Sequence, residues 1–366
     1  MIDIAQAHSG DWPAIARFVE RCYGASARYK GEARWRWQME QAPYPMASAS
    51  HPPSWIAHDG AEVVGQISLQ PGRLWLSGEP LDIGWIVDVM IDERYRGKGL
   101  GHRLYGAILD AGHVAVTLTM APATRQIAMR AGSVELPPVA QLLRAQNLSQ
   151  ATIRRWAEHS AEAGGRAGRI RHVTPVAKAV LDLVSIMSKP RSQNPDLVSK
   201  VHAVDRVDKR DLEQWQERIQ SGALTGFDRS DAFWRWRFEN APDLDYRFAK
   251  LSGDGKARGI MAWREPLSCE LPVGTIADVL CDPEDGEGME ALLHYGLSEL
   301  QHCEAVIAGA STECEITAYR KAGFKPVKWH RPTVSARDTA VLEKIESASQ
   351  WRMTKADHDW DQVHPC

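Results

Sequence analysis

The feature that most constrains the fold is a short glycine-rich segment between a strand-like run and a helix-like run. Residues 86–91 (IVDVMI) are apolar and rich in β-branched side chains, which favours a strand. Residues 96–101 (RGKGLG) contain three glycines, too many for a regular helix or strand. Beyond this segment the apolar residues recur at helical spacing: Leu104, Ala107, Ile108 and Ala111. The sequence therefore predicts a strand, a glycine loop and a helix in direct succession.

A glycine loop that opens a helix is suited to binding phosphate groups. The first backbone N–H groups of a helix have no internal partner, and the helix dipole is positive at that end. Glycines allow a phosphate to approach the backbone closely. A tight turn without a ligand is the alternative interpretation. The residues that we predict to bind a diphosphate are Arg96, Gly97, Lys98, Gly99, Leu100 and Gly101.

The spacing of the glycines distinguishes between known phosphate loops. A Walker loop is absent, and Gly97-x-Gly99-x-Gly101 does not have the Gly-x-Gly-x-x-Gly spacing of a dinucleotide loop. Arg96, Gly99 and Gly101 match Arg-x-x-Gly-x-Gly, which resembles the pyrophosphate loop of the GNAT (GCN5-related N-acetyltransferase) superfamily. In that superfamily the loop holds coenzyme A. The resemblance implies an α/β (α+β) fold class, with a mixed, mostly antiparallel sheet flanked by helices in each domain.

Composition limits the classes of protein that fit this chain. Its 366 residues suit two domains, and a net charge of −3 provides no field that would attract nucleic acid or a membrane surface. None of the six cysteines forms a C-x-x-C pair, which argues against a zinc site and a disulfide framework. We find no signal peptide and no run of about 18 apolar residues. We therefore expect a cytoplasmic protein without a metal, a membrane partner or a nucleic-acid partner.

An internal repeat predicts that the fold occurs twice. Residues 33–43 align with residues 232–242, with seven of eleven positions identical, and residues 84–92 align with residues 274–282, with five of nine identical. Two matched blocks in the same order indicate a tandem duplication. The domains that we predict are a GNAT domain at residues 1–150, a basic, helical linker at residues 151–199, and a degenerate GNAT-like domain at residues 200–366.

The second copy lacks the features that would bind a diphosphate. At the offset of 190 residues, Arg96 corresponds to Gly286, and Gly99 corresponds to Met289. The run at residues 282–288 (DPEDGEG) carries four carboxylates, which would repel a diphosphate. We therefore expect only the N-terminal copy to bind the cofactor.

The resemblance implies an acyltransferase mechanism that uses acetyl-CoA, or another acyl-CoA, as co-substrate. In this mechanism an amine attacks the thioester, a tetrahedral oxyanion forms, and the thiolate leaves. Backbone groups of Val89, Met90 and Ile91 would hydrogen-bond the pantetheine and polarise the thioester carbonyl. The acceptor that we expect is a primary amine of a small molecule.

Two residues are candidates for proton transfer, Asp88 and Tyr319. Asp88 lies on the predicted strand next to the thioester contacts and could act as a base. Its counterpart Asp278 lies in the copy that is not expected to catalyse, which favours a structural role. The usual acid of the superfamily is a tyrosine four residues before the glycine of a late helix. That position is Ala128 in the first copy and Tyr319 in the second, so Tyr319 could serve only if the two copies share a site.

Three other interpretations follow from individual segments. The missing tyrosine in the first copy suggests a non-catalytic acyl-CoA-binding or scaffolding protein as an alternative function. Basic residues between positions 154 and 191 suggest acyl transfer to a macromolecule such as a protein lysine, against the simpler reading of a solvated linker. The repeated tryptophans predict core packing, with a stacking surface for a sugar or an aromatic acceptor as the alternative: Trp35, Trp37, Trp234 and Trp236.

Overall fold

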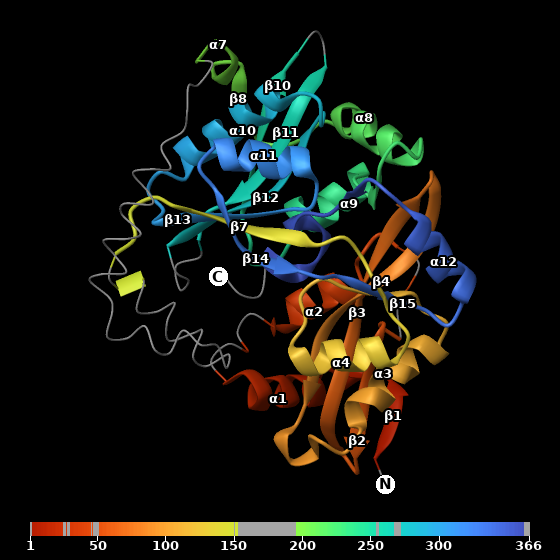
Figure 1. The fold of residues 1–366 in the computed structure, drawn as a ribbon. Helices are drawn as coiled ribbons and strands as arrows, with labels where there is room; N and C mark the ends of the chain where they lie inside the picture. Colours follow the sequence, from red (N-terminus) through yellow and green to blue (C-terminus); the bar gives the residue numbers. More distant parts are fainter. Residues whose placement is uncertain are drawn as a thin grey trace.

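The structure is a computed structural model, and the part of the chain that it describes forms two mixed sheets with helices packed on their faces (Figure 1). Most of the predicted linker, including its basic side chains between positions 154 and 191, lies outside the described residues. The described residues are 2–24, 27, 30–44, 46, 51–149, 151–152, 195–253, 256–266 and 272–361.

The first sheet is built mainly from the N-terminal half of the chain. Its centre is a long hairpin of β3 (Glu62–Leu76) and β4 (Glu79–Ile91), whose turn places Ser77 and Gly78 at positive φ, as a tight hairpin turn requires. Two short strands extend the sheet beyond β3, namely β9 (Thr225–Phe227) and β16 (Trp351–Arg352). The main strand order is β1 (Asp3–Gln6), β2 (Ser54–Asp59), β3, β4, β5 (Ala115–Thr117), β15 (Thr333–Ser335) and β6 (Val134–Glu135).

Amphipathic helices cover this first sheet. In α1 (Trp12–Tyr23) a proline lies in the first turn, where its missing N–H costs nothing, and Ile15, Phe18 and Val19 form the buried face. The helix predicted to follow the glycine loop is confirmed as α3 (Leu100–Asp110), which begins two residues earlier than its apolar spacing suggested. The other helices of this half are α2 (Glu32–Met39) and α4 (Pro122–Arg130).

The second sheet repeats this plan in the C-terminal half. Its strand order is β14 (Lys325–His330), β7 (Val139–Ala145), β13 (Ala305–Ala310), β12 (Val273–Cys281), β11 (Ala257–Arg264), β10 (Tyr246–Ser252) and β8 (Val201–Val204). The helices of this half are α7 (Pro195–Val198), α8 (Lys209–Gln220), α9 (Asp231–Trp234) with a π turn (Arg235–Glu239), α10 (Gly286–Glu299), α11 (Glu313–Lys321) and α12 (Thr339–Ser347). No helix in the described part of the chain is long and apolar enough to cross a membrane.

Each sheet contains strands from the other half of the chain: β7 in the second sheet, and β15, β9 and β16 in the first. In Figure 1 the yellow strand β7 lies between β13 and β14, while the blue strand β15 joins the first sheet between β5 and β6. Hydrogen bonds between side-chain hydroxyl groups hold β15 in the first sheet. The hydroxyl oxygens of Tyr105 and Ser335 are 2.6 Å apart, and those of Thr117 and Thr333 are 2.8 Å apart. Because each sheet needs a strand from the other half, the boundary predicted at residue 150 does not separate two self-contained sheets.

The repeated tryptophans meet where the two halves join. The rings of Trp37 and Trp236 stack with their centroids 4.8 Å apart. Each indole N–H donates a hydrogen bond to the backbone carbonyl of the other residue, at 2.8 and 2.9 Å. These two residues are buried, as are Trp35 and Trp234, so the predicted core packing is confirmed. The alternative of a stacking surface is wrong, because the rings do not reach solvent.

Candidate active site

Strand β4 departs from regular strand geometry at Asp88. Two residues of β4, Asp88 and Val89, lie opposite the single residue Ile67 of β3, which defines a β-bulge. Asp88 has a φ of +54°, a left-handed conformation that is uncommon for a residue other than glycine. A strained residue of this kind in the middle of a sheet is typical of a functional position.

The same strand separates from its neighbour just before the bulge. β4 pairs with the parallel strand β5 only at Gly84 and Trp85, so the two strands diverge from Ile86 onward. Beyond that point no strand in the described part of the chain pairs with the edge of β4 that faces β5. The predicted thioester and pantetheine contacts, residues 89–91, belong to this free edge.

The glycine loop leads from the end of β4 into an uncapped helix. Gly99 occupies the N-cap position of α3 with a φ of +77°, and no side chain caps the helix. A Cβ atom placed on Gly97 or Gly99 would meet nothing within 4 Å, so the space in front of the helix is open. Arg96 and Lys98 are exposed beside it. This geometry fits an anionic group such as the diphosphate of an acyl-CoA, held by free backbone N–H groups and nearby cations.

Gly101 has a different role from the other loop glycines. A Cβ atom on Gly101 would lie 2.8 Å from Cδ1 of Ile127, which is too close for two carbon atoms. The glycine therefore allows α3 to approach α4. Leu100, next to it, is buried in the core, so only its backbone could contact a ligand.

The corresponding helix of the second copy is closed by its own side chain. Asp285 is the N-cap of α10, and its carboxylate accepts a hydrogen bond of 2.9 Å from the N–H of Gly288. Arg258 pairs with the same carboxylate. Burial alone would raise the pKa of Asp285, but these two partners hold it below its ordinary value. The anion site of this copy is thus filled by a residue of the chain.

The strand gap of the second copy is filled as well. β12 and β13 pair only over residues 273–275 of β12, and the space beyond them holds a buried ionic network. Arg352 lies 2.8 Å from Asp278 and 2.7 Å from Glu315, and Arg229 lies 2.6 Å from both Asp278 and Asp357. As far as its residues are described, the second copy therefore has neither an open helix terminus nor an open gap.

In the first copy, a pocket of about 340 Å³ lies at the strand gap. The first half supplies residues 86–89 of β4 and side chains between residues 117 and 124. The second half supplies Lys328 and His330 from β14 and residues from the C-terminal segment, defined here as residues 351–361. The two copies therefore share a site. Among the described residues no group of three or more metal-binding side chains is placed to hold a metal ion.

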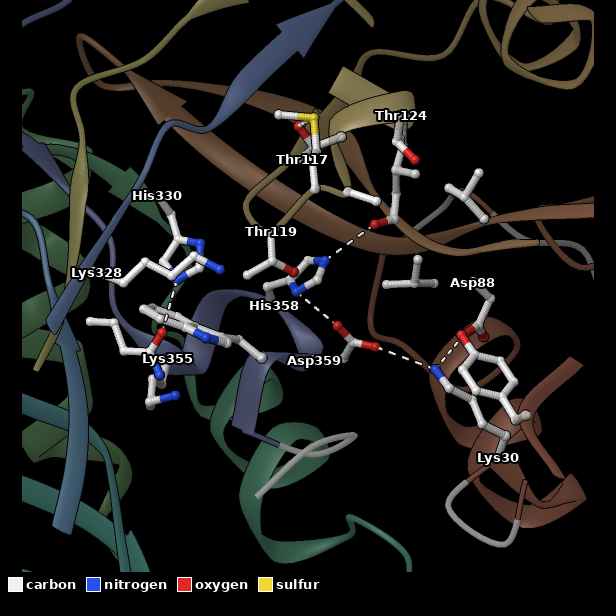
Figure 2. Close-up of a pocket in the computed structure, with 18 residues that line it drawn as sticks. Lys30, Asp88, Thr117, Thr119, Thr124, Lys328, His330, Lys355, His358 and Asp359 are labelled. Atoms are coloured by element: carbon white, nitrogen blue, oxygen red, sulfur yellow. Dashed lines mark hydrogen bonds and ion pairs between the residues drawn. The ribbon is translucent and has the colours of Figure 1, made fainter. Parts of the chain in front are cut away.

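An ionic cluster occupies one end of this pocket (Figure 2). Lys30 pairs with Asp88 and lies 3.7 Å from Asp359. Asp359 lies 2.8 Å from Nδ1 of His358, whose Nε2 donates a hydrogen bond of 3.2 Å to the carbonyl of Ile86. The C-terminal segment is thereby attached to β4 two residues before the bulge.

The cluster shifts the pKa values of its members in opposite directions. Burial alone would lower the pKa of Lys30, but Asp88 and Asp359 raise it above its ordinary value. Burial alone would also lower the pKa of His358, and the Asp359 carboxylate reverses this and raises it. Burial would raise the pKa of Asp359, but His358 and Lys30 hold it far below its ordinary range. Lys30 and Asp359 are therefore charged at neutral pH.

The repeat relates this cluster to the network of the second copy. At the offsets found in the sequence, Lys30 corresponds to Arg229 and Asp88 corresponds to Asp278. Both pairs are ion pairs, and in each copy the C-terminal segment adds a carboxylate, Asp359 or Asp357. Because the degenerate copy keeps the same arrangement, the pair at Asp88 is explained by a structural role. The catalytic role of Asp88 stays a prediction.

The other end of the pocket is basic. Lys328, His330 and Lys355 lie together there in Figure 2, and the ammonium of Lys355 lies 4.0 Å from the centre of the Trp360 ring. Burial, together with Lys328, Lys355 and His358, lowers the pKa of His330 to about 3. His330 is therefore neutral and donates a hydrogen bond of 3.2 Å to the side-chain oxygen of Gln141.

The prediction that Tyr319 supplies the acid is not supported by its position. Although the two copies share a pocket, Tyr319 is buried in the core of the second copy, packed edge-on against Phe324, and does not line that pocket. The first-copy position, Ala128, is also buried. A different tyrosine, Tyr23, lines the pocket next to Lys30. Burial and the neighbouring Asp88 raise the pKa of Tyr23 to about 12.

Residues 12–128 match the Acetyltransferase (GNAT) family. This part of the chain is therefore similar to a GNAT domain. The fold of the whole chain is that of a tandem-GNAT protein, with an intact N-terminal copy and a degenerate C-terminal copy. A comparison with curated proteins gave no match.

Solved structures share this fold at low sequence identity. A GCN5-related N-acetyltransferase from Anabaena variabilis ATCC 29413 is 13% identical, with a TM-score of 0.56 over 91% of this chain and 72% of that chain. A tandem GNAT protein from the clavulanic acid biosynthesis pathway is 11% identical, with a TM-score of 0.52 over 92% and 98%. Saccharomyces cerevisiae N-myristoyltransferase with bound myristoyl-CoA is 12% identical, with a TM-score of 0.54 over 91% and 82%.

Proposed function

We propose that this protein is an N-acyltransferase that moves an acetyl or other acyl group from acyl-CoA to a primary amine of a small molecule. The observation that carries the proposal is the asymmetry between the copies. Among the described residues, the first copy alone combines an uncapped helix terminus, an open gap between two diverging strands and a pocket at that gap. The pocket volume of about 340 Å³ suits a small ligand.

The acyl-CoA would be held by two parts of the first copy. Residues 96–101 and the free N–H groups of α3 would hold the diphosphate, with Arg96 and Lys98 adding positive charge. The free edge of β4 at Val89, Met90 and Ile91 would bind the pantetheine. When bound there, the acyl-CoA supplies the activated acyl group as a thioester. The C–N bond forms as the C–S bond breaks, the ammonium of the acceptor loses one proton, and the leaving thiolate takes one up.

Two pocket residues are suited to these proton transfers. Burial alone would lower the pKa of His358, but Asp359 raises it, which suits a general base. The ring would accept the proton at Nε2, which would give up its hydrogen bond to the carbonyl of Ile86. Asp359 orients it through Nδ1. Tyr23, with its pKa raised to about 12, stays protonated and can donate a proton to the thiolate. Asp88 is the alternative proton acceptor.

The first experiment is calorimetric titration of acetyl-CoA into the wild type and the Gly99→Glu variant. This substitution strains a residue with positive φ and places a carboxylate at the anion site. We expect one site per chain in the wild type and a loss of affinity of at least about tenfold in the variant, since each 1.4 kcal/mol is tenfold. Gly112→Glu is the matched control, because Gly112 also has positive φ and open space but lies beyond the other end of α3.

The outcomes separate the candidate functions. Equal affinity in the wild type and Gly99→Glu would show that the loop is a structural turn. Loss of binding in Gly99→Glu, followed by thiol release when the wild type is given a panel of amines, supports the transferase. Binding without thiol release from any amine of the panel would favour a non-catalytic acyl-CoA-binding protein.

A further inference from the structure

The two ends of the shared pocket differ in charge. One end holds the two carboxylates Asp88 and Asp359, and the other holds the two ammonium groups of Lys328 and Lys355 (Figure 2). His358 lies between the two ends in this view. A pocket with separated charges of opposite sign selects a ligand that carries both a cationic and an anionic group.

The carboxylate end lies at the site of the proposed chemistry. Asp88 is the bulge residue of β4, next to the strand edge that would bind the thioester. Lys30 already neutralises part of the charge of Asp88 and Asp359. The amine of an acceptor would reach the thioester from this end, so its remaining groups extend toward the basic end.

The basic side chains at this end that the structure describes come from the second half of the chain. Among the described residues no carboxylate pairs with Lys328, which lines the pocket from β14. The ammonium of Lys355 is held over the Trp360 ring, in a buried position where it cannot turn to solvent. Burial lowers the pKa of His330, and the positive charges of Lys328, Lys355 and His358 lower it further. An anion bound here would accept charge-assisted hydrogen bonds from these ammonium groups.

We infer that the acceptor is an amine that also carries an anionic group, a carboxylate or a phosphate, bound by Lys328 and Lys355. This inference rests on the proposed function for the amine end, and it adds the chemical class of the substrate. The degenerate copy thus acquires a role, because its strand β14 and the C-terminal segment would recognise the acceptor. Neutral amines and polyamines would be poor acceptors.

The test uses the full chain, acetyl-CoA and matched pairs of amines, with thiol release as the readout. The pairs are amino acids with their carboxamides and phosphoethanolamine with ethanolamine, which distinguish carboxylate from phosphate. We expect the anionic member of at least one pair to be preferred in kcat/KM by about 10- to 100-fold, the range of a charge-assisted hydrogen bond. In Lys328→Met this preference should fall through a raised KM. Lys325→Met, on the same strand but outside the pocket, should keep it.

A second readout separates this inference from the proposed function. Binding of N-acetylated amino acids and their carboxamides is measured by calorimetry in the wild type and Lys328→Met. Binding of the acids that depends on Lys328, without thiol release from any amine, would preserve the anion site and overturn the transferase. Equal turnover of the anionic and neutral members of every pair would overturn the inference and leave the transferase intact.

Discussion

We expect the protonation of the His358 side chain to determine how activity varies with pH. As a general base it acts in its neutral form, so kcat/KM for the amine should rise with pH through a pKa above the ordinary histidine value of about 6.5. In His358→Gln we expect a loss of about 10²- to 10⁴-fold, the usual contribution of a general base. The remaining rate should follow only the ionisation of the amine, as measured in a pH–rate profile from pH 5.5 to 9.5.

The alternative base gives a different profile. If His358 is not the base, His358→Gln leaves the shape of the pH–rate profile unchanged. Folded content, measured by circular dichroism of each variant, controls for the buried position of His358.

The side chain of His330 should make the protein less stable in acid. Its pKa is lowered to about 3 in the folded state, whereas the unfolded chain takes up the proton near the ordinary value of 6.5. Between these values the unfolded state binds more protons, so the free energy of unfolding falls as the pH falls. At pH 5 the free energy of unfolding should have fallen by about 2 kcal/mol, because each pKa unit corresponds to about 1.4 kcal/mol.

Urea unfolding at pH 7.5 and pH 5.0 tests this expectation. His330→Gln should lose less stability between the two pH values than the wild type does. His202→Gln, at an exposed site on β8, is the control and should behave like the wild type. An equal loss in His330→Gln and the wild type would contradict the prediction.

Only some of the individual residues of the site could be predicted from the sequence. The glycine loop and Asp88 could be found because strand, loop and helix are contiguous in the chain. Lys30, His358 and Asp359 were missed, since they come together only in the folded chain. A signal for Lys30 was present, because the repeat places it at Arg229. The Asp- and His-containing run at residues 355–361 was the corresponding signal for the C-terminal segment.

Among the helices, α10 shows how one side chain can close an anion site. Removal of its N-cap in Asp285→Ala should lower the free energy of unfolding by about 1 kcal/mol, the usual cost of losing a cap. Acetyl-CoA binding should keep one site per chain, because the strand gap beyond α10 is still filled by Arg352 and its partners. Urea unfolding and calorimetric titration measure the two quantities.

A matched cap supplies the control for this experiment. Asp338 caps α12 through a hydrogen bond of 2.9 Å to the N–H of Ala340, so Asp338→Ala should cost a similar amount of stability. A second acetyl-CoA site in Asp285→Ala would show that the carboxylate alone closes the degenerate copy.

Elements with strong local signals were predicted well. The strand before the glycine loop and α3 both depend on residues close together in the chain. The bulge at Asp88 was not visible, because it is defined by pairing with β3 rather than by composition. The misassignment of Tyr319 has a similar cause: its position in the repeat was right, but the core of the second copy surrounds it.

On the scale of the whole molecule, the exchanged strands should make the two halves depend on each other. Residues 1–152 expressed alone lack β15, β9 and β16 and expose β7 as an unpaired strand. We expect neither this fragment nor residues 195–366 to unfold cooperatively alone, whereas the two expressed together should associate in a 1:1 complex. Size-exclusion chromatography and calorimetric melting measure these outcomes.

Independent folding of one half would contradict this expectation. A cooperative melting transition of residues 1–152 alone would show that the first sheet does not need β15. The full chain, which should melt in a single transition, is the reference.

The repeat predicted two copies, but it could not predict how they pair. The sequence of each copy is the same whether its exchanged strand joins its own sheet or the sheet of the other copy. No local pattern therefore distinguishes these two arrangements. The same limit applied to Trp37 and Trp236: their burial was predicted from repetition, but their mutual contact was not.

The reciprocal Trp37–Trp236 pair and the exchanged strands are the contacts that a symmetric dimer of single domains would make. In such a dimer every substitution occurs in both subunits, so a carboxylate at one helix terminus would abolish both cofactor sites. Joining the copies in one chain removes that constraint. One copy can then keep its open glycine loop, while the other places Asp285 in its own and contributes side chains to its neighbour's pocket.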